Sequence, residues 1–449
     1  MSELLVGNGT VLTLGDRNRV IPHAAVAIRD GLIVEVNDVA ALVGRYAGAR
    51  YIDAHGGLIM PGFINAHTHF YGAFARGMPF QGPPPANFKE ILERVWWRLD
   101  RGLLAPDVRY SALLGLLDCV RKGTTTIFDH HASPHCVEGS LDLIAEATTL
   151  AGVRACLCYE VSDRDGRAIA GQGVTENRRF LERCRSLPSP LQSMLRAAFG
   201  LHASFTVHDD TLAASAAVCD SFHAPVHVHV AEADVDVETS VRAYGARPVA
   251  RLHRAGLLDR PALLAHCVHL DEEEHALLAE RGSWVLHNPQ SNMNNAVGTA
   301  PLPRLLASGV RVALGSDGMT ADMTAEMRAL CFAQRAATQD PRTLDLGQMY
   351  DILFRQNASL VEQTFNVKTG VLEPGAAGDV IVVDYDPPTP LTDDNFLGHL
   401  FFGVSGAPVR STIVAGSPLM ENGRLLTLDA SEIHAKAREL APRAWKRMD

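Results

Sequence analysis

Between residues 62 and 317, short apolar runs alternate with longer amphipathic stretches. Eight apolar runs have the length of strands, and most gaps between them are long enough for a helix. This alternation is typical of a parallel sheet whose strands are connected by helices. It predicts an α/β fold, a (β/α)₈ barrel of the TIM type. The predicted strands are 62–67, 124–129, 154–160, 196–202, 225–232, 262–268, 283–288 and 311–317.

The two ends of the chain have a different pattern. Residues 1–60 contain short β-rich runs broken by Gly, Asn and Asp turns, and similar runs return after residue 366. We expect 1–60 and 366–430 to form one small composite β-sandwich beside a barrel at 61–365. The remaining stretch, 431–449, is predicted to be a charged helix.

Composition and charge narrow the classes of protein. The chain has 449 residues, of which 47% are hydrophobic and 20% charged, as in an ordinary globular protein. A formal net charge of −10 and the absence of a basic cluster indicate no nucleic-acid partner. No apolar run has the length of a membrane span, and no secretion signal is recognisable, so we expect a cytoplasmic protein without membrane association. Its eight cysteines are then expected to be free thiols.

Polar side chains gather where the predicted strands end, which is where barrel enzymes place their chemistry. His67 and His69 end the first strand, and residues two apart in a strand point the same way, so both imidazoles can reach one metal ion. A single such pair is explained as well by two surface histidines. The other strand ends carry, in chain order, His229 and Glu232 (fifth), His266 (sixth) and Asp317 (eighth). Nitrogen and oxygen ligands at four strand ends are hard to explain by chance.

We predict that one divalent metal ion is bound by His67, His69, His229 and Asp317. Histidine and carboxylate ligands of this kind suit Zn²⁺, and they also bind Fe²⁺ or Mn²⁺. Such an ion lowers the pKa of a bound water toward about 7 and makes hydroxide available at neutral pH. Asp317 can accept a proton from this water.

Two further residues are candidates for proton transfer. Glu232, three residues past His229, is the expected shuttle, the alternative being a solvated loop carboxylate. His266 is either a further metal ligand or a donor to the hydroxide or the substrate, and we favour the second. The roles of His130 and His131, which follow the second strand, stay open.

Three candidates for substrate contact lie nearby. His202 ends the fourth strand and faces the site if the barrel forms, the alternative being structural packing. Arg76, seven residues past His69, can bind a carboxylate or ring oxygen, or form a salt bridge within its loop. Of Trp96 and Trp97, one is expected to stack on a flat ring and the other to pack in the core, and Trp96 is our candidate for the first role.

These motifs resemble those of a known family. The stretches PGFINAHTHF, GTTTIFD, HVAE, LLAHCVHL, LHNPQSN and LGSDG are similar to the amidohydrolase superfamily. Within it, the chain resembles the group of guanine deaminase, S-adenosylhomocysteine deaminase and triazine hydrolase. WWRLDR, DHHASP and HNPQSNMNNAVG most closely resemble the SsnA-type aminohydrolases.

The resemblance implies an enzyme that acts on carbon–nitrogen bonds in cyclic amidines. Its substrate would be a small amino-substituted nitrogen heterocycle, such as a purine, pyrimidine, pterin or triazine, and ammonia would be released. The resemblance further implies a homodimer, one metal on the four ligands named above, an acid–base role for Glu232 and a polarising role for His266.

Other reactions remain as alternatives. The same site can open a cyclic amide, or displace chloride or an alkylamine from a ring. A protein that only binds, with an inherited metal site, is a rival from another class. Relatives with two metals bridge them through a carboxylated lysine at the end of the fourth strand. This chain has no lysine between Lys122 and Lys368, which favours a single metal.

Overall fold

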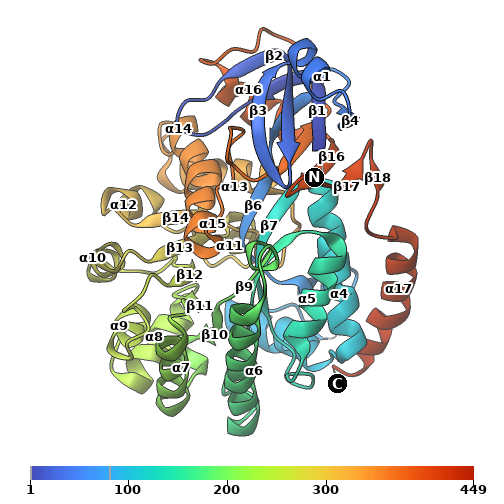
Figure 1. The fold of residues 1–449 in the computed structure, drawn as a ribbon. Coiled ribbons are helices and arrows are strands. Elements are labelled where there is room, and N and C mark those ends of the chain that lie inside the picture. Colours follow the sequence, from blue (N-terminus) through green and yellow to red (C-terminus); the bar gives the residue numbers. More distant parts are fainter. Residues whose placement is uncertain (1–2, 80–81, 449) are drawn as a thin grey trace.

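The computed structural model describes residues 3–79 and 82–448, and residues 1–2, 80–81 and 449 lie outside the described part (Figure 1). A barrel of parallel strands surrounded by helices occupies most of the chain. A mainly antiparallel sheet, built from both ends of the chain, lies beside it at the top of Figure 1.

The barrel strands form two parallel sheets that join edge to edge. The first runs β6-β7-β8-β9 and the second β10-β11-β12-β13-β14. Isolated parallel bridges, Thr68 to Asp317 and Val161 to Leu201, connect the two sheets on both sides and close the ring. The strands are β6 (Phe63–Thr68), β7 (Thr124–His131), β8 (Arg154–Tyr159), β9 (Leu195–Ala197), β10 (Phe199–Ala203), β11 (Val226–Val230), β12 (Leu263–His266), β13 (Trp284–His287) and β14 (Arg311–Leu314). All eight predicted strands are therefore confirmed, the fourth being divided at Ala198 into β9 and β10.

The barrel interior changes from apolar to polar along the strands. Phe128 of β7 and Cys158 of β8 belong to a buried apolar cluster in the interior. His130 and Glu160 lie two residues further along the chain, on the same side of their strands. The polar residues consequently lie together at the carboxyl ends of the strands, above an apolar core.

Helices cover the outside of the barrel because their apolar faces pack on the strands. Helix α10 begins at an Asp271 cap that pairs with Glu274, and it ends at Gly282, whose φ of +60° is left-handed. The helices along the barrel are α4 (Ala105–Lys122), α5 (Ser140–Ala151), α6 (Arg167–Ser186), α7 (Asp209–Phe222), α8 (Asp234–Tyr244), α9 (Pro248–Arg254), α10 (Glu272–Arg281), α11 (Pro289–Asn294), α12 (Leu302–Ala307), α13 (Met323–Thr338), α14 (Leu346–Tyr350) and α15 (Asn357–Phe365). No helix in the described part of the chain combines the length and apolar character needed to cross a membrane.

Both ends of the chain contribute to one nine-stranded sheet, in the order β18-β17-β16-β15-β5-β1-β2-β3, with β4 paired to β1. The join is antiparallel between β5 and β15, where Pro61 faces Val380. Valine and isoleucine side chains from both ends share one core, so the expected joint β unit is confirmed. The domain boundaries, 1–60 and 366–430 for the β unit and 61–365 for the barrel, stay a prediction. The strands are β1 (Glu3–Leu12), β2 (Val20–Arg29), β3 (Leu32–Asp38), β4 (Arg50–Asp53), β5 (Leu58–Pro61), β15 (Val380–Val383), β16 (Val409–Val414), β17 (Ser417–Glu421) and β18 (Arg424–Leu425).

The carboxyl-terminal segment is helical, as expected. Helix α17 (Ala430–Lys446) packs along α4, at the right of Figure 1. Trp445 Nε1 donates a hydrogen bond to the carbonyl of Phe74 (2.8 Å), which ties this helix to the loop after β6. Helices α1 (Val39–Arg45) and α16 (Phe396–Phe402) belong to the segments at the two ends of the chain.

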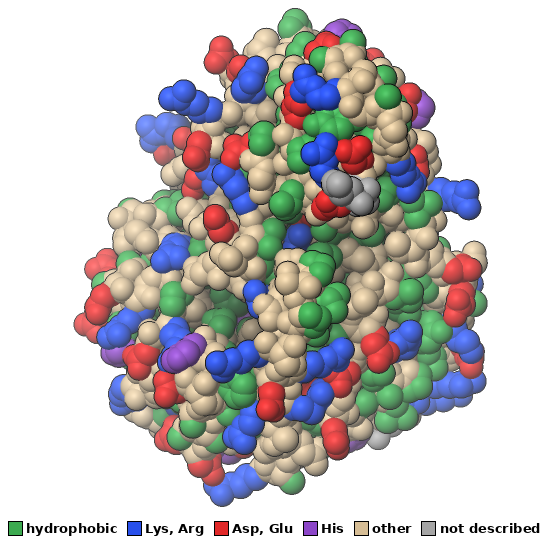
Figure 2. All heavy atoms as spheres, viewed as in Figure 1, with side chains coloured by type: hydrophobic (Ala, Val, Ile, Leu, Met, Phe, Trp, Pro, Cys, Tyr) green, Lys and Arg blue, Asp and Glu red, His purple; other side chains and the backbone are tan. Residues whose placement is uncertain are grey.

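On the face drawn in Figure 2, acidic and basic side chains are interspersed over the barrel and the nine-stranded sheet. No extended patch of one charge is visible on that face.

Candidate active site

Four side chains predicted as metal ligands converge at the carboxyl ends of the barrel strands. His69 Nε2 lies 3.1 Å from His229 Nε2 and 3.1 Å from Asp317 Oδ1. His67 Nε2 lies 3.8 Å from the same Asp317 oxygen. Ligands that each stand about 2.0–2.2 Å from one zinc ion are separated by distances of this size.

The three imidazoles are oriented by contacts on their far side. His69 Nδ1 donates to the carbonyl of His130 (2.5 Å), and His229 Nδ1 donates to the carbonyl of His202 (2.8 Å). These bonds place the proton on Nδ1, so the two Nε2 lone pairs face each other at 3.1 Å. Facing lone pairs repel each other unless a cation lies between them. Metal-bound histidines typically donate their other ring N–H to a backbone carbonyl or carboxylate, as His69 and His229 do here.

His67 is held in a comparable way. Its Nδ1 lies 2.9 Å from Nε2 of His227, while its own Nε2 is buried without a hydrogen-bond partner among the described residues. An orphaned nitrogen of this kind is costly in a protein interior. A metal ion at this point accounts for it, so the residues present fit the expected cofactor.

Asp317 lies next to the first barrel strand because the bridge between Thr68 and Asp317 closes the barrel. Its backbone N–H donates to the carbonyl of His67 (2.9 Å), and its φ of +54° turns the chain sharply after β14. The hydroxyl of Ser291 donates to Oδ2 of Asp317 and leaves Oδ1 toward His69. The carboxylate is thereby fixed between two barrel segments.

The electrostatics of the site favour positive charge. Burial disfavours a charged His69 ring, but the hydrogen bond with Asp317 and the nearby negative charges together outweigh burial and raise the pKa to about 9. Burial would raise the pKa of Asp317, but the contact with His69 holds that pKa well below its usual range. A proton or a metal ion can supply the cation that this pair attracts.

Glu232 and His266 lie beside this group. His266 Nε2 is 3.5 Å from Glu232 Oε2 and 3.8 Å from Asp317 Oδ2, and it has no hydrogen-bond partner among the described residues. His266 Nδ1 donates to Oδ1 of Asn292 (2.7 Å), which orients the ring. Burial raises the pKa of Glu232 to about 7, so this carboxyl can hold or release a proton near neutral pH.

A pocket opens over these residues, with about 470 Å³ of space that is continuous with solvent. Trp96 forms one wall, packing over Gly318, where an added Cβ would come within 3.3 Å of the indole. The lining comprises His69, Tyr71, Phe88, Leu92, Trp96, Trp97, Glu160, Arg164, His202, His229, Glu232, His266, Asn295, Asp317 and Gly318. The aromatic members come mainly from the segment that contains η1 (Phe70–Ala75), α2 (Phe88–Ile91), η2 (Leu92–Trp96) and α3 (Trp97–Arg101).

Of the residues considered for substrate contact, three line the pocket and Arg76 does not. His202, Trp96 and Trp97 all line the pocket, so the expected division of the two tryptophans between pocket and core is not observed. Arg76 is absent from the described lining and forms an ion pair with Asp118, with half of its side chain exposed. Arg76 thus forms a salt bridge, the alternative to substrate contact, with a partner on helix α4 and not within its own loop.

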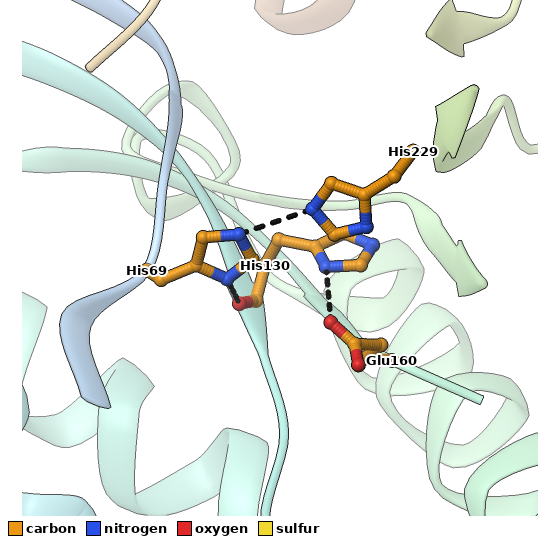
Figure 3. A group of neighbouring side chains, drawn as sticks. All are labelled: His69, His130, Glu160 and His229. Carbon is orange, nitrogen blue, oxygen red and sulfur yellow. Dashed lines mark hydrogen bonds and ion pairs between the residues drawn. The ribbon is translucent and has the colours of Figure 1, made fainter. Parts of the chain in front are cut away.

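Sequence reasoning missed Glu160 and left the role of its neighbour His130 open. Figure 3 draws Glu160 with His69, His130 and His229, whose ligand atoms lie within 4.8 Å of one another. The Nε2 atoms of His69 and His229 point to the proposed metal position beside Asp317. The other two members of this group, His130 and Glu160, pair with each other at 3.2 Å and do not form a second metal site by themselves. A signal was available, because Glu160 is the last residue of a predicted barrel strand, and the other site residues also lie at or just after strand ends.

Comparisons with known proteins agree with this geometry. The sequence profile of the Amidohydrolase family matches residues 58–419. A 5-methylthioadenosine/S-adenosylhomocysteine deaminase of Syntrophomonas wolfei subsp. wolfei is 33% identical, over 98% of this chain and 98% of its own. A 5'-deoxyadenosine deaminase of Methanosarcina mazei is 30% identical over the same shares. The crystal structure of an adenosine deaminase from Xanthomonas campestris with bound zinc superimposes with a TM-score of 0.85 at 27% identity, covering 99% of this chain and 98% of that one. The chain therefore belongs to the amidohydrolase family.

Proposed function

We propose that this protein is a metal-dependent aminohydrolase that removes an amino group, as ammonia, from a nitrogen heterocycle, with aminopurines as the first class of substrate. The observation that carries the proposal is the convergence of Nε2 atoms from three histidines and one carboxylate beside a pocket that also contains Glu232 and His266. The names of its relatives, which are deaminases of adenosine derivatives, support the same class.

We propose that His67, His69, His229 and Asp317 hold one metal ion, with zinc as the first choice. Zinc is bound in the similar adenosine deaminase, and nitrogen and carboxylate ligands suit it. When bound, the ion supplies a nucleophile at neutral pH by lowering the pKa of water, and it polarises the bond under attack.

The chain's own residues move the protons. Asp317, with Oδ2 held by Ser291, accepts a proton from the attacking water as the oxygen adds to the carbon that bears the amino group. Glu232 donates a proton to the neighbouring ring nitrogen, so that negative charge does not build up there. Once Glu232 has given up its proton, its carboxylate stabilises a proton on Nε2 of His266, 3.5 Å away, and His266 donates a hydrogen bond from that nitrogen to the new oxygen. The proton on Asp317 then passes to the amino group, which leaves as ammonia. As the carbonyl forms, the remaining proton of the new oxygen returns to Glu232.

The test is ammonia release by the zinc-loaded protein from a library of aminated heterocycles. We expect turnover of at least one aminopurine. Carboxylate or chloride formation without ammonia would instead indicate ring opening or dechlorination at the same site. If no purine, pyrimidine, pterin or triazine is converted by protein with full zinc, the enzyme is silent and the proposal fails.

We also propose a cytoplasmic homodimer, as the family resemblance implies. All eight cysteines are free and most are buried, which suits a reducing compartment. The molar mass in solution, measured by light scattering, tests the dimer.

A further inference from the structure

We propose that Glu160 determines substrate specificity: one of its carboxylate oxygens, together with Nε2 of His202, binds a substrate group that carries two neighbouring hydrogen-bond donors. The inference rests on the proposed function for the reaction at the adjacent metal ligands. It adds a contact that the proposed proton transfers do not use.

Glu160 is anchored on the side away from the pocket. It is 4% exposed, and its Oε2 lies 3.2 Å from Nδ1 of His130. His130 is in turn fixed by a hydrogen bond from its Nε2 to the carbonyl of His227 (3.1 Å). Figure 3 shows one carboxylate oxygen turned to His130 and the other turned away from it. Because Glu160 lines the pocket and His130 is not among the lining residues, the free oxygen, Oε1, faces the pocket.

Oε1 has no hydrogen-bond donor within reach among the described residues. The nearest cationic or imidazole nitrogens are His202 Nε2 and Arg164 Nη1, each 3.9 Å away. Both distances exceed those of a hydrogen bond. Oε1 is open to the pocket, so a ligand that fills the pocket covers this oxygen and must donate a hydrogen bond to it, or the oxygen is left buried without a partner.

His202 presents a second acceptor beside Oε1. Its Nδ1 lies 2.6 Å from the hydroxyl oxygen of Thr206, and that hydroxyl donates to the carbonyl of Ala203 (3.2 Å). We assign the hydroxyl proton to this carbonyl, so that His202 donates to Thr206 and carries its proton on Nδ1. Nε2 is therefore a lone pair that faces the pocket, 3.9 Å from Glu160 Oε1.

Arg164 compensates the charge of Glu160 and is itself occupied. It pairs with Asp100 and with Asp165 (3.1 Å), and its guanidinium lies over the Trp97 ring at 5.3 Å. An anionic substrate group at this end of the pocket would meet the Glu160 carboxylate and no free cation among the lining residues. The pair of acceptors consequently selects neutral groups that donate two hydrogen bonds.

Two kinds of substrate carry such a group. One is a ring N–H beside an exocyclic amino group, and the other is the vicinal diol of a sugar. The two matched probe pairs are guanine with 1-methylguanine, which lacks the ring N–H, and adenosine with 2',3'-dideoxyadenosine, which lacks the diol. Binding to the zinc-loaded protein is measured by calorimetry in a Glu232→Gln background, which slows turnover.

We expect the donor-bearing member of one pair to bind about 10- to 100-fold more tightly than its partner, the range for hydrogen bonds to a charged group. The pair that shows the preference identifies the source of the donors. Glu160→Gln, which keeps the size but replaces an acceptor by a donor, should reduce the preference to less than threefold. Glu160→Asp, which keeps the charge beside His130 but withdraws it from the pocket, should do the same if the glutamine variant does not fold. The control Glu146→Gln changes an exposed carboxylate paired with Arg109 on the surface and should leave the preference intact.

Three results would overturn the inference. They are a preference that survives both Glu160 variants, no preference in either pair with Glu160 present, and a loss of zinc from Glu160→Gln, which would make Glu160 a metal ligand. Failure of the proposed function gives a different result. In that case Glu160-dependent binding persists, but protein with Glu232 intact releases no ammonia.

Discussion

Replacing Glu232 by glutamine tests the proposed proton transfers most directly. Glutamine has nearly the same size, so the pocket keeps its shape, and Asn295 Nδ2, which donates to Oε1 of Glu232 (3.3 Å), can still donate to the amide oxygen. The variant loses the titratable carboxyl group, whose Oε2 lies 3.5 Å from His266 Nε2. The variant therefore separates acid–base chemistry from pocket geometry.

General acid–base catalysis contributes about 10²- to 10⁴-fold, so kcat of Glu232→Gln should fall by that factor, equivalent to about 2.7–5.5 kcal/mol in the barrier. Zinc content should not change, because Glu232 lies outside the proposed ligand set. Burial raises the pKa of Glu232 to about 7, and the protonated form is the proposed donor. Activity of the parent protein should consequently fall as the pH rises through about 7, or at a lower pH if a bound cation lowers this pKa. The variant should lack that limb of the pH profile.

The assay combines steady-state ammonia release across pH with elemental analysis of zinc. Glu238→Gln, an exposed carboxylate on α8, is the matched control and should behave like the parent protein. The reasoning is refuted if Glu232→Gln keeps its rate within tenfold of the parent. A variant that loses zinc but keeps its rate per bound zinc would show that Glu232 is a ligand and no acid.

Three further predictions concern the metal, the stability and the pocket. His67→Ala combined with His69→Ala should give metal-free protein, and undiminished zinc by elemental analysis would contradict the ligand set. Asp379→Ala should lower the free energy of unfolding by about 3–5 kcal/mol, because it leaves the buried Arg154 guanidinium without its partner; a loss below 1 kcal/mol in denaturant titration would contradict this. Arg76→Ala should change kcat/KM less than twofold, since Arg76 pairs with Asp118 outside the pocket, and a tenfold loss would restore it as a substrate contact.

The order of the strands and the position of the ligands could be predicted from the sequence. Strand-length apolar runs separated by helical stretches specify a parallel barrel, because buried strands need apolar residues on both faces. Parallel strands also direct all their carboxyl ends to one rim, so residues as distant as His69 and Asp317 could be assigned to one site from their place after a strand. The structure brings these two side chains to 3.1 Å.

What remained undecided depends on contacts that no local pattern encodes. Glu160 pairs with His130 because two neighbouring strands, β7 and β8, lie in a register that only their pairing determines. The positions of Trp96 and Arg76 depend on the path of the segment after β6, which packs against α4 and the loop after β14. The fold class and the strand ends that carry the proposed ligands follow from the sequence, since the periodicity of apolar residues is a local property. Only the tertiary structure decided the walls of the pocket, because side chains far apart in the sequence become neighbours through packing.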